Sequence, residues 1–63
     1  MTEILRHRWL HDLAFRAEKV GAISWRQIDR VRHGQMVFVG GETMSPNELE
    51  SHVKFMEERN GNK

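Results

Sequence analysis

The residues whose spacing best suits metal chemistry are His7 and His11, four positions apart in a segment with helical periodicity. Two histidines one helical turn apart can hold a metal ion. The zinc-protease form of this pattern needs a glutamate directly after the first histidine, and Arg8 occupies that position. We therefore interpret the pair as surface histidines on a polar flank, and we expect no metal site and no cofactor.

The hydroxyl and carboxylate side chains also have non-catalytic explanations. The chain contains no cysteine and no tyrosine. Ser24, Ser45 and Ser51 are placed as helix caps or surface residues, and Glu57 with Glu58 fits a solvated helix face rather than an acid–base pair. We expect no catalytic residues and a protein that is not an enzyme.

A helix-turn-helix is an alternative interpretation of residues 17–31. Small, glycine, apolar and polar residues occur there in the order of this DNA-binding motif, and residues 24–33 would form the recognition helix. The turn is one residue longer than usual and only one helix precedes it, so an ordinary corner between two helices with a basic surface competes with this interpretation. The side chains that would contact a major groove are Arg26, Gln27 and Arg30.

Three helices are predicted to position these groups. The first spans residues 2–20, with Thr2 as its N-cap and Gly21 at its end. The second spans residues 25–33 after the S-x-x-Q capping box of Ser24, with Trp25 on its inner face. The third starts at the Ser45 capping box and runs to about residue 60. The first helix carries an apolar stripe of Leu5, Trp9, Leu13, Ala17 and Val20.

Residues 36–39 form the only apolar run with strand character. Alternation places apolar side chains on both faces, so the strand needs cover on both sides and a backbone partner. The chain offers one weak partner, Glu42–Met44, and the same strand of a second copy is the alternative. The sequence leaves open whether Glu42–Met44 forms a second strand.

The length favours a dimer. With 63 residues the chain is one domain, residues 1–63, with residues 60–63 expected as a disordered tail. A core of this size rarely supplies more than about 3–5 kcal/mol of folding stability. Because the chain has no cysteine for disulfides, oligomerisation is the favoured source of additional stability. We predict a mostly helical α+β fold, helix–short helix–strand–helix, forming an intertwined homodimer whose single strand pairs across the two-fold axis. The expected interface comprises Trp9, Leu13, Met36, Val37, Phe38, Val39, Leu49, Val53 and Met56.

Three apolar residues lie off the helical stripes: Ile4, Phe15 and Phe55. We predict that they line an exposed apolar cleft between the first and third helices, suited to an amphipathic helix of another protein. The alternative is burial of Phe15 and Phe55 at the dimer interface. The predicted rim is Arg8, Lys19 and Glu58.

The charge distribution is uneven although the net charge is only +1. Residues 1–33 hold seven Lys/Arg and four Asp/Glu, and residues 34–63 hold three and five. This asymmetry suits packing of the two halves against each other, and a basic binding face on the first half is the alternative. No stretch resembles a signal peptide or a membrane span, so we expect a cytoplasmic protein with no membrane partner.

Two long stretches, LRHRWLHDLAFRAEKVGAISWRQIDRV and MVFVGGETMSPNELESHV, resemble a family of small early proteins of lambda and related temperate phages, encoded between the exonuclease and excisionase genes. The resemblance implies a mostly helical homodimer in the host bacterial cytoplasm. It also implies a non-enzymatic role that favours lytic development over host survival, through a host or phage protein partner. The family has no established site residues to transfer.

Overall fold

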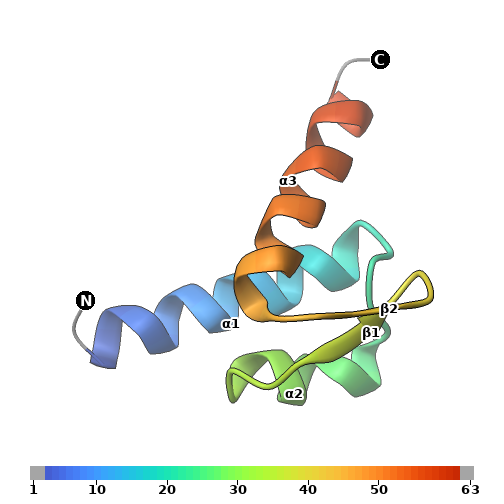
Figure 1. Ribbon diagram of the computed structural model, residues 1–63. Helices are drawn as coiled ribbons and strands as arrows, with labels where there is room; N and C mark the ends of the chain where they lie inside the picture. The colour runs from blue at the N-terminus through green and yellow to red at the C-terminus, as the bar shows by residue number, and fades with distance from the viewer. Residues whose placement is uncertain (1–2, 62–63) are drawn as a thin grey trace.

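The computed structural model describes residues 3–61. Three α-helices, one 3₁₀ turn and two strands follow one another along the chain (Figure 1). The elements are α1 (Glu3–Lys19), η1 (Trp25–Gln27), α2 (Ile28–Arg32), β1 (Val37–Val39), β2 (Glu42–Met44) and α3 (Pro46–Gly61). The mostly helical α+β class predicted from the sequence is confirmed, whereas the predicted cap Thr2 lies outside the described residues.

Gly21 ends α1 by adopting a φ of +80°, a left-handed conformation that glycine reaches without a Cβ clash. The amide of Gly21 donates to the carbonyl of Glu18 at 3.0 Å, and the amide of Ala22 donates to the carbonyl of Ala17 at 2.9 Å. These two bonds form a Schellman motif, which satisfies carbonyls that the helix end would otherwise leave free. The predicted end of the first helix is therefore confirmed.

Both predicted capping boxes are present. The amide of Ser45 donates to Glu48 Oε1 at 3.1 Å, and the amide of Glu48 donates to Ser45 Oγ at 3.4 Å. At the other box, the amide of Ser24 donates to Gln27 Oε1 at 3.1 Å. The second helix nevertheless starts as the 3₁₀ turn η1, and α2 ends at Arg32. The expectation that Trp25 faces inward is wrong, because its side chain is 71% exposed at the start of that turn.

The prediction of a single strand is wrong. β1 pairs with β2 in antiparallel register, with Val39 opposite Glu42 and Val37 opposite Met44. The two-residue turn consists of Gly40 and Gly41, which have φ values of +57° and +91°. Positive φ at both positions gives a type I′ turn, whose twist matches that of the flanking strands. The architecture is therefore helix–short helix–hairpin–helix, and β1 finds a backbone partner within its own chain.

The core is built from aliphatic side chains of every α-helix and of β1. Only one face of β1 enters it, because Val37 and Val39 are buried while Met36 and Phe38 are exposed. The expectation that both strand faces are covered is therefore not met within the chain. Among the described residues no polar or charged side chain is buried. The buried residues are Leu10, Leu13, Ala14, Ala17, Ile23, Val31, Val37, Val39, Leu49 and Val53.

The helix α3 crosses α1, and its C-terminal turns project away from α2 and the hairpin (Figure 1). It remains helical through residues 60 and 61, which are the first two positions of the predicted tail. Since each added residue extends an existing helix by one hydrogen bond, the helix continues past its last core contact. Residues 62–63 lie outside the described residues. Within residues 3–61 no helix is long and apolar enough to cross a membrane.

Candidate interaction surfaces

The aromatic side chains all lie outside the buried core. Trp9 is half-buried, and the other four are exposed. Aromatic residues are the most frequent anchors of protein interfaces, because they bury a large area with little loss of conformational freedom. The surfaces that carry them are therefore the candidate binding surfaces. The exposed aromatic residues are Phe15, Trp25, Phe38 and Phe55.

The outer face of the hairpin carries Met36 and Phe38, which are 49% and 63% exposed. In a two-residue hairpin the pair flanking the turn is hydrogen-bonded, so the backbone groups of Phe38 point toward the free edge of β1. Gln27 Nε2 already donates to the carbonyl of Phe38 at 3.0 Å. This bond occupies the centre of the edge that the predicted pairing of β1 with a second copy would use. The outer face remains accessible.

Five of the nine residues predicted for a dimer interface are buried inside the single chain: Leu13, Val37, Val39, Leu49 and Val53. In this fold they have no surface to offer a second copy. Met36 and Phe38 are exposed, while Trp9 and Met56 are half-buried. A second copy can therefore reach the outer face of the hairpin and the margins of α1 and α3.

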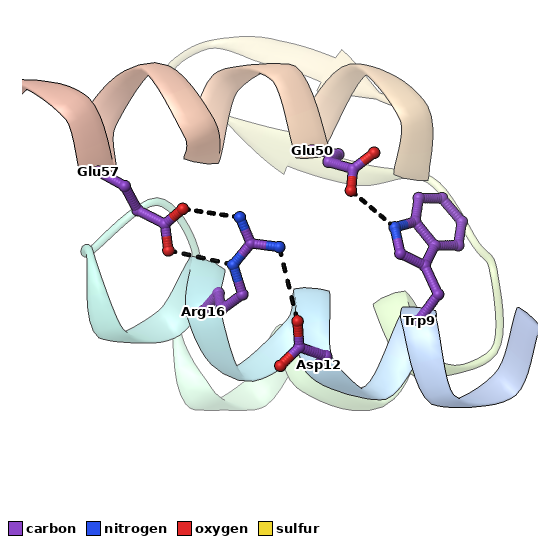
Figure 2. Close-up of polar contacts among 5 residues, drawn as sticks. All are labelled: Trp9, Asp12, Arg16, Glu50 and Glu57. Atoms are coloured by element: carbon purple, nitrogen blue, oxygen red, sulfur yellow. Dashed lines mark hydrogen bonds and ion pairs between the residues drawn. The ribbon is translucent and has the colours of Figure 1, made fainter. Parts of the chain in front are cut away.

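The contact between α1 and α3 is closed by two polar pairs (Figure 2). The indole Nε1 of Trp9 donates to Glu50 Oε1 at 2.8 Å. Arg16 donates twice to the Glu57 carboxylate, from Nε at 3.1 Å and from NH2 at 2.7 Å. Asp12 lies 3.5 Å from Arg16 NH1 on the same helix. Each pair joins residues that are 41 positions apart in the chain.

The paired charges shift each other's proton affinity. The hydrogen bond from Arg16 lowers the pKa of Glu57, against a smaller opposing effect of desolvation. The same hydrogen bond raises the pKa of Arg16, with attraction to Glu57, Asp12 and Glu50 adding to it. Glu57 therefore stays ionised at neutral pH and stabilises the α1–α3 contact there.

Ile4, Phe15 and Phe55 are exposed, and of these three residues Phe15 lines the depression described below. Phe15 lies on the outer side of α1, where its ring packs against His11 at a centroid separation of 4.8 Å. Phe55 is two residues before Glu57, about 200° around the helix, so it points away from the side of α3 that contacts α1. The guanidinium of Arg59 lies 5.7 Å from its ring centroid.

An open depression of about 840 Å³ is lined by six residues of α1 and one residue of α2. It contains Phe15 and Arg8 of the predicted cleft, but none of the other residues assigned to that cleft or its rim. Sequence analysis missed the contribution of Arg32, for which the basic character of residues 1–33 was the only signal. The lining residues are His7, Arg8, Trp9, His11, Asp12, Phe15 and Arg32.

The side chains of the three predicted DNA contacts differ in their contacts and exposure. The side chain of Gln27 is held by Ser24 and by the carbonyl of Phe38, so it is part of the fold. The guanidinium of Arg26 lies over the ring of Trp25, 5.5 Å from its centroid. Arg30 is exposed, on a helix of only five residues.

His7 and His11 line the same depression, but a metal site needs more ligands than these two. Over residues 3–61, no group of three or more His, Cys, Asp or Glu side chains is placed to hold a metal ion.

Comparison with protein-family models, with curated proteins and with solved structures finds no match to this chain. The fold alone therefore defines the class of this protein. It is a small, mostly helical α+β domain with a two-stranded antiparallel sheet and an aliphatic core.

Proposed function

We propose that the protein is a homodimeric protein-interaction module that acts without catalysis. The observation that carries this proposal is the exclusion of every aromatic side chain from the buried core. A single aromatic side chain can bury about 150–250 Å² at an interface. Leaving several of them in water is unfavourable, at about 25 cal/mol for each Å² of apolar surface, and a partner that covers them recovers this free energy.

The dimer contact that we propose is the outer face of the hairpin. A two-fold axis beside this face would bring Met36 and Phe38 of one copy against the same residues of the other. Such a contact leaves the bond between Gln27 and the carbonyl of Phe38 intact. It replaces the edge-to-edge pairing of β1 expected from the sequence, and it requires no core residue to move.

The exposed Phe15, Trp25 and Phe55 remain free for a second, different protein. The resemblance to early proteins of lambdoid phages supports a host or phage protein as this partner. The module would then act in the host bacterial cytoplasm and shift the infection toward lytic development.

Sedimentation equilibrium at micromolar concentration tests the dimer. We expect a mass of about twice the 7.5 kDa chain for the unmodified protein and for Phe55→Ser. Phe38→Ser should sediment as a folded monomer, because it removes the centre of the contact and leaves the core intact. A monomeric unmodified protein would contradict the proposal. A dimeric Phe38→Ser variant would move the contact to another face.

A winged helix-turn-helix is the second candidate, because the hairpin follows α2 in the chain and Arg26 and Arg30 are exposed. Binding that depends on phosphate contacts weakens steeply as salt rises, whereas an apolar contact does not. Gel shift of duplex DNA at low salt, abolished by the double change Arg26→Ala and Arg30→Ala, would favour this candidate. Absence of a gel shift with micromolar protein would favour the protein-interaction module over the DNA-binding candidate.

A further inference from the structure

The depression on α1 combines positive charge with an exposed ring. Arg8 and Arg32 come from two different helices, and His7 and His11 also belong to its lining. Its one acidic residue, Asp12, is paired with Arg16 at 3.5 Å, so its charge is partly neutralised. Guanidinium groups bind phosphate with two parallel hydrogen bonds, which makes a pair of arginines a suitable phosphate site.

Arg32 has hydrogen-bonding capacity that its own chain does not use. Its NH1 atom lies 3.5 Å from Asp29, whose side chain is largely exposed. Its Nε is buried and, among the residues that the structure describes, has no hydrogen-bond partner. An unsatisfied buried donor is unfavourable. A small reorientation of the side chain toward an anion in the depression would relieve it.

Phe15 supplies a surface for a planar group at the other end of the depression. Arg8 and Phe15 lie seven residues apart on one side of α1, which is two helical turns or roughly 10 Å along the axis. A base can stack on an aromatic ring of this kind whatever its sequence context. The volume of about 840 Å³ falls within the range of small-molecule sites, about 300–1,000 Å³.

We propose that this depression binds a nucleoside phosphate, either free or as one unit of a single-stranded nucleic acid. Arg8 and Arg32 hold the phosphate, and the base stacks on Phe15. The site does not depend on the proposed dimer, since neither Met36 nor Phe38 lines it. It also differs from the helix-turn-helix candidate, whose contacts are Arg26 and Arg30 on a duplex.

Titration of ¹⁵N-labelled protein with adenosine monophosphate tests the site by NMR. We expect saturable shifts of the amides of Arg8, His11, Phe15 and Arg32. Arg8→Gln, on an exposed position, should weaken binding at least tenfold, and Arg32→Gln should do the same. Arg30→Gln is the matched control on α2, with a Kd within twofold of the unmodified protein.

Two further probes separate the sources of the ligand. A single-stranded hexanucleotide that binds at least tenfold more tightly than the mononucleotide, with the same residues shifted, would identify a strand, and equal affinity would identify a free nucleotide. Either result supports the site. Absence of saturable shifts at millimolar nucleotide would overturn it. So would equally tight binding of inorganic phosphate or of a glutamate-rich peptide, because the base would then contribute nothing.

Discussion

The aliphatic core and the polar α1–α3 contact hold the same helices together by different means. The core contains only Leu, Ile, Val and Ala side chains, and no polar or charged residue of the described part of the chain belongs to it. The α1–α3 contact adds Trp9–Glu50 and Arg16–Glu57, which are half-buried pairs with specific geometry. Apolar burial is non-directional, whereas a bidentate hydrogen bond fixes the relative position of two side chains. The core therefore supplies most of the stability, and the polar pairs set the register between α1 and α3.

The largest expected effect comes from the core. Leu13 is fully buried on α1, and Leu13→Ala should lower the free energy of unfolding by about 2–5 kcal/mol through lost burial and the cavity left behind. Ile4→Ala on the same helix is the control, since Ile4 is 73% exposed and its truncation should change stability little. Urea denaturation of both variants measures the difference. Equal losses would contradict the assignment of the core.

The next effect separates the polar contact from the core by its pH dependence. Because Arg16 lowers the folded-state pKa of Glu57 below its ordinary value of 4.5, the unfolded state binds this proton more readily. The pair therefore stabilises the fold above about pH 4.5, and its contribution disappears as the pH falls through the lowered pKa. Glu57→Gln should lower the melting temperature at pH 7, and the difference from the unmodified protein should shrink as the pH falls below 4.5 and through the lowered pKa of Glu57.

Glu58→Gln is the control for this measurement, because Glu58 is the exposed neighbour of Glu57. It should melt like the unmodified protein at every pH. A difference between Glu57→Gln and the unmodified protein that persists unchanged at low pH would show that the carboxylate charge does not act through Arg16.

The smallest effect is expected from the indole hydrogen bond. Trp9→Phe keeps most of the apolar ring but removes the donor to Glu50, so stability should fall by about 0.5–1.5 kcal/mol. The double variant Trp9→Phe with Glu50→Ala should lose little more stability than the less stable of its two single variants, because each single change already removes the same hydrogen bond. Additive losses by chemical denaturation would show that Trp9 and Glu50 act independently.

Local chemistry in the sequence was sufficient to place most element boundaries. The Ser45–Glu48 box, the Ser24–Gln27 box and the glycine after α1 each operate over six residues or fewer, so they can be recognised without knowing the fold. The Gly40–Gly41 turn is equally local, because it depends on the positive φ of two neighbouring glycines. The sequence left its second strand open because Glu42–Met44 has little strand character of its own and is stabilised by pairing with β1.

The candidate surfaces were less accessible to sequence analysis. Exposure of Ile4, Phe15 and Phe55 follows from helical periodicity, but their assembly into one cleft does not. Periodicity describes one helix and says nothing about how two helices cross.

The sequence by itself determined the helices, the glycine turn and the aliphatic positions that could form a core, because these depend on interactions between near neighbours. Only the tertiary structure decided which face of β1 is covered, that Arg16 meets Glu57 across 41 residues, and that Arg32 joins Arg8 and Phe15 at one depression. Those contacts arise when α2 and α3 pack against α1. Their geometry depends on the simultaneous fit of many side chains, which no local pattern in the chain specifies.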